Sequence, residues 1–213
     1  TIPAPYHFTY PSIGVSAVLS DMLKNLPAAM SFLKVSANYA QVGNGGQFGV
    51  RNASYTFYPG AGNGGIGRGT ILPIPGLKPE LVKSYEFGLE SRFINDRIGF
   101  MLTWYHSNST NQLLTIPLPV GTGYASKYLN AGNIENHGLE LVVNGTPVKG
   151  KDFSWDVQLN FSLNRNKVIK LSDELKSADL AGGDQRSALP RVQEGGSFGD
   201  LYAHHWLKND KGQ

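Results

Sequence analysis

The segment from Phe153 to Leu163 reads Phe-Ser-Trp-Asp-Val-Gln-Leu-Asn-Phe-Ser-Leu. Apolar and polar residues alternate along it without exception. Because successive side chains of a β-strand point to opposite faces of the sheet, this alternation predicts a strand with one apolar face and one polar face. A helix would repeat its apolar residues every three or four positions, so the segment favours a β fold.

Five further segments alternate in the same way. They cover residues 12–19, 33–39, 84–93, 98–104 and 139–144. In each, aliphatic or aromatic residues recur at every second position, and most of the residues between them are polar or small; Ser91 interrupts the apolar row of the third segment. A seventh strand is predicted near residues 198–207, where the alternation is weaker. The sequence therefore predicts an all-β protein, an antiparallel meander of about seven long strands.

The connections between these segments alternate in length. Residues 95–97 and 149–152 are short turns, whereas long polar loops are predicted at about 44–80, 112–132 and 170–196. Outer-membrane β-barrels have short turns on the periplasmic side, long loops on the outer side, and strands of about ten residues across the bilayer. The order of turns and loops therefore favours part of a transmembrane barrel wall whose short turns face the periplasm.

A soluble β-sandwich would also alternate, with its apolar side chains buried between two sheets. Sandwich strands are commonly five or six residues long, and their turns follow at closer intervals. The strand length and the unequal loops favour the membrane barrel, while a soluble, secreted glycan-binding β-sandwich stays open as the alternative.

Composition excludes several other classes of protein. The chain has 213 residues, a formal net charge of +3 and no cysteine, and its Lys and Arg residues are scattered. The sequence therefore predicts no nucleic-acid partner, no disulfide and no Cys-based metal site. A continuous apolar stretch long enough for a transmembrane helix is also absent. Because the chain begins at Thr1 without a signal sequence and ends at Gln213, we expect it to be a piece of a longer protein.

Two glycine-rich motifs resemble enzyme signatures but lack the required context. Residues 195–199 match the nucleophile elbow of hydrolases, yet too little sequence follows Ser197 to supply an acid and a histidine in chain order. Residues 60–65 contain a G-x-G-x-x-G match, but Tyr58-Pro59 precedes it and no helical pattern follows. Both are better interpreted as loops.

Two pairs of ionisable residues also fail as catalytic or metal sites. Glu86 and Glu90 share one strand face, but four residues of strand separate them by about 13 Å, which is too far for a glycosidase pair. His204 and His205 are adjacent, so on a strand they would point to opposite faces. The sequence therefore predicts no enzyme activity and no cofactor.

Several motifs resemble the barrel of SusC/RagA-type TonB-dependent transporters. Leu77-Lys78-Pro79-Glu80 precedes Ser84-Tyr85-Glu86-Phe87-Gly88-Leu89-Glu90, and Asn130 to Glu140 is similar to that family's N-x-G-x-I-x-N-x-G-x-E segment. The remaining matching segments are 10–14, 34–44 and 95–98. The resemblance covers nearly the whole chain in the family's order, although His137 stands where a Lys is common and residues 202–206 depart from the pattern.

The resemblance implies a fold, a location and a function. Such proteins are plugged barrels of about 22 strands in the outer membrane of Bacteroidetes, surrounded by lipid. They import glycans (oligosaccharides) or peptides with energy that TonB supplies through the plug, and a SusD-like surface lipoprotein closes over the barrel. Residues 1–213 are then expected to be a partial barrel domain that lacks the plug domain, the TonB box and the signal peptide.

Two sets of residues are predicted to form the functional surface. Polar residues of the alternating strands would line the lumen of the barrel: Glu86, Glu90, Asn144, Asp156, Gln158 and Asn160. Aromatic residues of the long loops could stack on sugar rings, because a flat ring offers an apolar face with a polar rim: Tyr55, Tyr58, Tyr124 and Tyr128.

Overall fold

The computed structural model describes residues 8–45, 52–58, 64–73, 76–172, 175–180 and 188–203. Its elements are almost all strands. In chain order they are β1 (Ser12–Val18), α1 (Leu19–Met22), β2 (Met30–Asn44), β3 (Tyr55–Tyr58), β4 (Gly65–Arg68), β5 (Ile71–Leu72), β6 (Glu80–Phe93), β7 (Ile98–Pro117), η1 (Val120–Thr122), β8 (Ser126–Lys149), β9 (Ser154–Lys170), β10 (Ser177–Asp179), β11 (Leu189–Gln193) and β12 (Asp200–Tyr202). Among these residues, none forms a helix long and apolar enough to cross a membrane.

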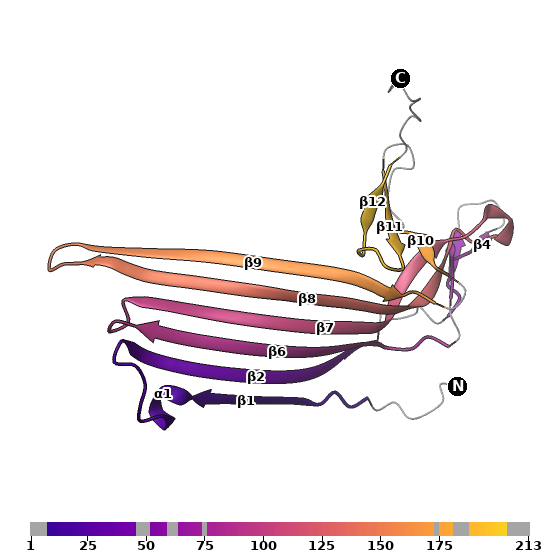
Figure 1. Ribbon diagram of the computed structural model, residues 1–213. Coiled ribbons are helices and arrows are strands. Elements are labelled where there is room, and N and C mark those ends of the chain that lie inside the picture. Colours follow the sequence, from indigo (N-terminus) through magenta and orange to yellow (C-terminus); the bar gives the residue numbers. More distant parts are fainter. Residues whose placement is uncertain are drawn as a thin grey trace, which may run out of the picture. The chain divides into compact units, whose positions relative to one another are not determined.

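The long strands form one sheet in the order β1-β2-β6-β7-β8-β9, and the short strand β5 also pairs with β8 (Figure 1). Strands β1 and β2 are antiparallel, with Ser12 opposite Ala40 and Val18 opposite Lys34. Only β5 runs parallel to its partner among the pairings that are described. The predicted all-β class, an antiparallel meander that does not close on itself, is confirmed.

The described chain divides into two compact units. Unit 1 comprises the described residues within 1–43, 82–108 and 135–166, and unit 2 those within 44–81, 109–134 and 167–213. Strands β7, β8 and β9 contribute residues to both units. The predicted partial barrel domain over residues 1–213 remains a prediction.

The turn between β6 and β7 is as short as the sequence predicts. Ile94, Asn95 and Asp96 all have positive φ, and the Arg97 N–H donates to the Ile94 carbonyl at 3.2 Å. Asn and Asp are the residues other than glycine that adopt this left-handed conformation most readily. The turn therefore brings β7 back beside β6 within two residues and sets the register of the pair.

Strands β2, β6, β7, β8 and β9 are longer than the predicted ten residues, and this corrects the predicted loops. Strand β7 runs to Pro117 and β8 begins at Ser126, so the loop predicted at 112–132 shrinks to a short connection. The loop predicted at 44–80 contains β3, β4 and β5, and the loop at 170–196 contains β10 and β11. The alternation of apolar and polar residues ends where both faces of a strand are polar, but the backbone hydrogen bonds between strands continue there. The sequence pattern therefore underestimates the length of the strands.

Unit 2 carries two small sheets, which contain most of the strands found in the predicted loops. Strands β3 and β4 form a hairpin, with Tyr55 opposite Arg68. Strands β10, β11 and β12 form a three-stranded antiparallel sheet. The strand predicted at 198–207 is thus represented by β12, which pairs with β11, and its residues after 203 lie outside the described part.

A small apolar core stabilises unit 2. Its buried members come from β7, β9, the residue after β9, and β11: Leu114, Val168, Leu171 and Val192. Ala178, Leu180 and Phe198 pack against them. The core joins the ends of β7 and β9 that belong to unit 2 to the small sheet that follows in sequence.

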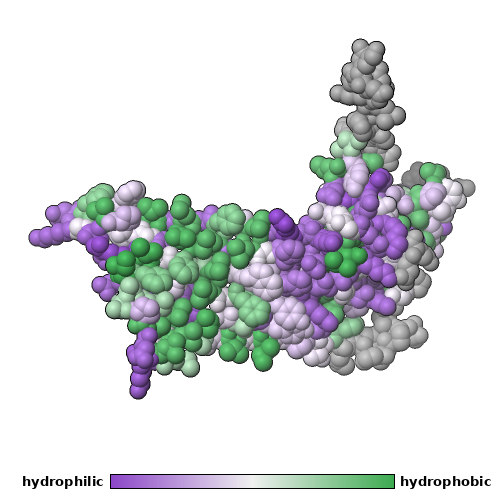
Figure 2. Space-filling model, viewed as in Figure 1, coloured by the Kyte–Doolittle hydropathy of each residue, from purple (hydrophilic) through white to green (hydrophobic). Residues whose placement is uncertain are grey.

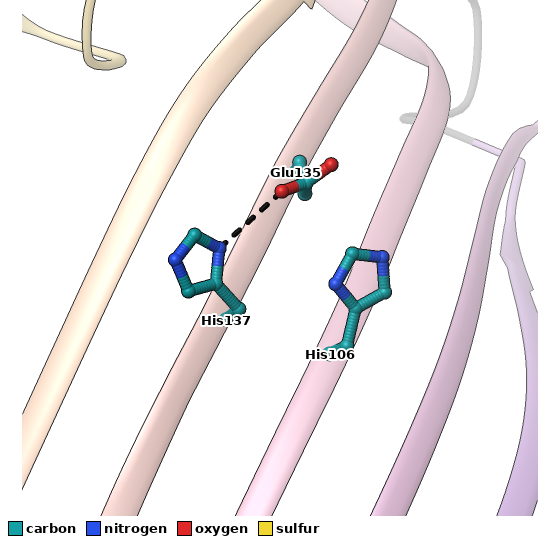
Figure 3. A group of neighbouring side chains, drawn as sticks. All are labelled: His106, Glu135 and His137. Carbon is teal, nitrogen blue, oxygen red and sulfur yellow. Dashed lines mark ion pairs between the residues drawn. The ribbon is translucent and has the colours of Figure 1, made fainter.

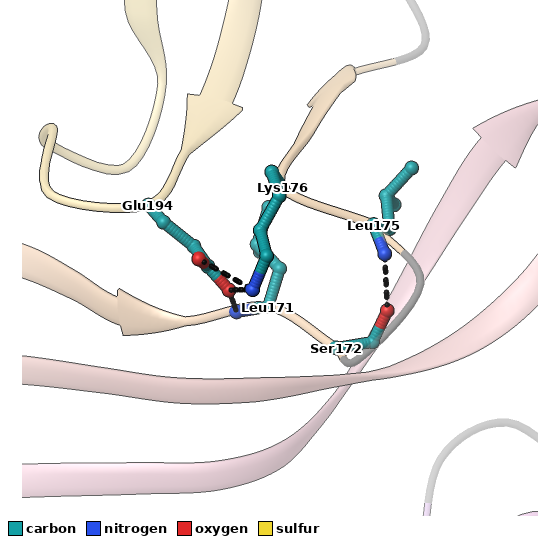
Figure 4. A network of polar contacts seen from close by, with 5 residues as sticks. All are labelled: Leu171, Ser172, Leu175, Lys176 and Glu194. Carbon is teal, nitrogen blue, oxygen red and sulfur yellow. Dashed lines mark hydrogen bonds and ion pairs between the residues drawn. The ribbon is translucent and has the colours of Figure 1, made fainter.

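Glu194 fastens the segment after β9 to the small sheet (Figure 4). Its carboxylate accepts the Leu171 N–H at 3.0 Å and lies 3.0 Å from the Lys176 ammonium. The backbone hydrogen bond from Leu171, and then the hydrogen bond from Lys176, hold the pKa of Glu194 below its ordinary value near 4.5.

This depressed pKa predicts how the segment responds to acid. A carboxyl with a lowered folded-state pKa stabilises the fold above its unfolded value and loses that contribution as the pH falls through the folded value. We expect the Leu171 amide of the full-length protein to stay protected from hydrogen exchange at a pH near 4.5, the ordinary pKa of glutamate, and to lose protection only in more acidic solution. Glu194→Gln should remove this pH dependence. Equal acid profiles for both proteins would contradict the assignment.

Candidate functional site

The strand register of unit 1 sorts polar and apolar residues onto opposite faces of the sheet. Side chains directly opposite in a ladder point to the same face. The contacts Asn38–Glu86, Phe87–Trp104 and Thr146–Asp156 fix the register of β2 with β6, β6 with β7, and β8 with β9. The Thr146 N–H donates to the Arg97 carbonyl and fixes β7 with β8. All the alternating strands then present their polar rows on one side, here called the polar face, and their apolar rows on the other, the apolar face.

The apolar face is built of continuous lines that cross β6, β7, β8 and β9. One line is Phe87, Trp104, Leu139 and Leu163; the next toward the short turns is Leu89, Leu102, Leu141 and Phe161; the next is Ser91, Phe100, Val143 and Leu159. Many of these large side chains are exposed, including Leu159 at 66% and Phe161 at 55%. Figure 2 shows the hydrophobic residues gathered across the long strands, with hydrophilic residues at the turns that join them.

Such a face distinguishes the two folds that the alternation allows. In a sandwich, a second sheet would bury these rows. All the described strands of unit 1 belong to one sheet, and many of its large apolar side chains remain exposed. A contiguous apolar surface of this kind requires a partner or a membrane. The alternative of a soluble β-sandwich therefore lacks its defining packing in this unit.

Glu86 and Glu90 lie together on the polar face, as the sequence predicts. They line a shallow depression of about 190 Å³ with Lys34, Ser36 and Thr103 among its other lining residues. Glu86 accepts a hydrogen bond from Asn38 at 3.3 Å, and Glu90 lies 2.9 Å from the Arg92 guanidinium. Both carboxylates are therefore partnered, and the depression presents charge of both signs.

The four other predicted wall residues lie on the same face, on β8 and β9. Asn144, Asp156 and Gln158 line a second depression of about 290 Å³. The Thr146 hydroxyl donates to Asp156 at 2.6 Å, and the Gln158 amide donates to Asn160 at 3.0 Å. The structure thus brings the six residues together in two groups on one polar face.

Two glycines of the Asn130–Glu140 motif make room for neighbouring strands. The Tyr105 hydroxyl passes over Gly138 and donates to Asn164 at 3.1 Å. A Cβ at Gly138 would overlap Tyr105, and a Cβ at Gly132 would overlap the backbone of Lys170 and Leu171. The motif therefore serves close strand packing, which sequence analysis alone did not reveal.

Asn130 joins the two motifs that carry the family resemblance. Its side chain accepts the Lys78 N–H at 2.8 Å and donates to the Lys78 carbonyl at 2.9 Å and the Asn111 carbonyl at 2.8 Å. Pro79 cannot donate a ladder hydrogen bond. The Asn130 amide therefore replaces strand pairing just before β6 begins.

The predicted loop aromatics have different environments. Tyr55 and Tyr58 lie in β3 and are 67% and 55% exposed. Tyr124 is half-buried, because the Arg68 guanidinium lies 3.9 Å from its ring centroid and the same side chain donates to the Gly123 carbonyl. Tyr128 is part of β8, so it lies, like Tyr55 and Tyr58, in a strand and not in the predicted loop. Tyr55 and Tyr58 thus keep a ring surface open to a ligand, whereas one face of Tyr124 is occupied.

A cluster of ionisable residues continues the apolar face beyond its last apolar line. His106 follows Trp104 on β7, and Glu135 and His137 precede Leu139 on β8 (Figure 3). Their nitrogen and carboxylate ligand atoms all lie within 4.8 Å of one another. Sequence analysis missed this cluster because the predicted strands ended at Trp104 and began at Leu139, whereas β7 continues beyond Trp104 and β8 begins before Leu139. The same every-second-residue pattern, extended along both strands, leads to His106, His137 and Glu135.

Comparison with known proteins identifies relatives of the chain. A family model described as "TonB dependent receptor-like, beta-barrel" matches residues 3–194. TonB-dependent receptor P3 of Formosa agariphila is 30% identical over 132 residues, which cover 61% of this chain and 13% of the relative. TonB-dependent receptor SusC of Bacteroides thetaiotaomicron is 35% identical over 97 residues, covering 45% of this chain and 10% of SusC.

Solved structures share the fold. The RagAB peptide importer in its closed-closed state superposes with a TM-score of 0.71 and 23% identity, covering 87% of this chain and 20% of that chain. Its open-open state gives a TM-score of 0.70 and 24% identity, covering 88% of this chain and 20% of that chain. The matched part of the chain thus spans between 10% and 20% of the length of these three relatives.

Proposed function

Because this chain belongs to the TonB-dependent receptor-like β-barrel family, we propose that it forms part of the wall of an outer-membrane barrel that actively imports oligosaccharides or peptides. In this proposal the apolar face meets lipid and the polar face lines the lumen. The observation that carries it is the separation of polar and apolar rows onto opposite faces of one uncovered sheet.

The physical basis is the demand that a bilayer makes on its proteins. A spanning strand must have its backbone groups paired and present apolar side chains to hydrocarbon. Strands β6 to β9 are paired with one another and carry at least three lines of apolar side chains. Successive lines are two residues, or about 7 Å, apart along a strand, so a few tilted lines suffice for an apolar band of about 25 Å.

The substrate and partners follow from the relatives and stay at the level of chemical class. RagAB is called a peptide importer, which supports a peptide cargo, and the resemblance to SusC/RagA-type transporters supports oligosaccharides as the other class. A SusD-like surface lipoprotein would close the barrel, and TonB would act through a plug segment. The polar-face residues Glu86, Glu90, Asn144, Asp156, Gln158 and Asn160 would hydrate the lumen and contact the plug. The exposed rings of Tyr55 and Tyr58 would contact cargo or lid.

Uptake by cells tests this function. We expect that deleting the gene for the full-length receptor abolishes growth on either oligosaccharides or peptides supplied as the sole source, because the intact molecules are too large to enter by diffusion. Reintroducing the gene should restore growth, and an uncoupler of the proton-motive force should stop uptake of the labelled nutrient.

The control separates import from simple binding. Cells that carry the receptor with its lipoprotein partner should still bind labelled nutrient at the surface after the uncoupler is added, while accumulation inside the envelope ceases. Accumulation that continues in uncoupled cells, or unchanged growth of the deletion strain on both nutrient classes, would refute active import by this protein.

A further inference from the structure

We propose that His106, His137 and Glu135 form a binding site for one divalent transition-metal ion on the apolar face. This site lies on the face opposite the proposed lumen and is independent of cargo transport. The three residues come from two neighbouring strands, and the register places His106 directly opposite His137, with Glu135 two residues before His137 on the same face.

The geometry suits a metal ion with three protein ligands. The His137 Nδ1 lies 3.3 Å from a Glu135 carboxylate oxygen, and all three ligand groups lie within 4.8 Å of one another. Ligands of a tetrahedral Zn²⁺ ion, with bonds of about 2.0–2.1 Å, are about 3.3 Å apart. His137 and Glu135 already have this spacing, and His106 can reach it by a small change of side-chain rotamer.

Neighbouring rings hold the two imidazoles in place. His106 lies between Trp104 and His137, with ring centroids 6.2 Å and 6.5 Å away and nearly parallel planes. Figure 3 shows both imidazoles on the same side of their strands, with the Glu135 carboxylate beside His137. Two histidines and one carboxylate match the chemistry that Zn²⁺ and similar ions prefer, and the partial exposure of His137 leaves room for water as a fourth ligand.

The charges around the cluster determine how tightly it binds. Glu135 supplies one negative charge, whereas on the same face Arg165 stands opposite His137 and Lys167 opposite Glu135, both on β9, and Lys83 lies on β6. These positive charges oppose a bound cation. Removing Arg165 should therefore strengthen metal binding, while removing a ligand should weaken it.

Titration of the metal-free, full-length receptor in detergent with Zn²⁺ tests the proposal. We expect one binding event that His106→Gln or His137→Gln weakens by at least about tenfold, and that Arg165→Gln strengthens. The double change His204→Gln with His205→Gln is the matched control for adventitious histidine binding and should leave this event intact. Zn-edge X-ray absorption of the wild type should show imidazole ligands that are lost when His106 and His137 are replaced together.

Two results would overturn the site. The first is an affinity for Zn²⁺ that persists in the His106→Gln, His137→Gln double variant, whose folding is checked by its heat-sensitive electrophoretic mobility. The second comes from an experiment that does not depend on whether the double variant folds. Crystals of the wild-type receptor soaked in ZnCl₂ should give an anomalous peak between the two imidazoles. A peak elsewhere, or no peak, would contradict the proposal.

Discussion

Alanine in place of Gly132 is expected to prevent the full-length receptor from folding stably. The added Cβ would overlap the backbone of Lys170 and Leu171, at the point where the Gly132 N–H donates to the Leu171 carbonyl. Backbone cannot swing aside as a flexible side chain can, so relieving the overlap means separating β8 from the end of β9. We expect a loss of roughly 3 kcal/mol or more, at the upper end for a single substitution.

Gly145→Ala on the same strand is the matched control. The nearest atom to its added Cβ is the Arg97 carbonyl oxygen at 3.6 Å, an ordinary van der Waals distance. This variant should therefore fold like the wild type. The measurement is the amount of heat-modifiable, folded receptor in the outer membrane, followed by the urea midpoint of unfolding. Similar behaviour of the two variants would show that the close approach at Gly132 is not required.

Arginine in place of Leu141 is expected to destabilise the receptor strongly in lipid. Leu141 lies on the apolar face between Leu102 and Phe161, one line inside the boundary at Leu139. A Lys or Arg on the lipid side of a barrel near the bilayer midplane costs about 2–4 kcal/mol. The expected result is a lower unfolding free energy in lipid vesicles and less receptor in the outer membrane.

The adjacent position tests whether the face, rather than the loss of an apolar residue, causes this effect. Val142 lies on the polar face, in the row of Glu140 and Asn144. Because Val142→Arg also replaces an aliphatic residue by arginine, its cost should stay below about 1 kcal/mol if the side chain meets water there. A penalty for Val142→Arg equal to or above that for Leu141→Arg would mean that the faces have been assigned the wrong way round.

The alternation in the sequence predicted the strands and their two faces well, for a physical reason. A strand with lipid or apolar contacts on one side and water on the other must alternate, so β9 could be identified from Phe153 to Leu163 alone. The six predicted polar residues share one face because every strand follows the same rule. Whether they line a lumen remains a prediction.

Other features depend on which strands are neighbours, and alternation carries no information about that. The hydrogen bonds of Asn130 to Lys78 link residues 52 positions apart. The Tyr105 hydroxyl reaches across β8 to Asn164, 59 positions away. The hairpin of β3 and β4 was missed because its glycine-rich sequence has no regular alternation and resembles a loop.

Beyond the line of Phe87, Trp104, Leu139 and Leu163, the side chains on the apolar face change from apolar to ionisable. This change would determine how deeply the barrel sits in its membrane. Sliding the wall inward by one step, about 7 Å along a strand, would immerse His106, His137 and Arg165 together in hydrocarbon. Sliding it outward would expose apolar rings to water. The barrel should therefore have one vertical position, and bilayers thicker or thinner than its apolar band should deform around it rather than shift it.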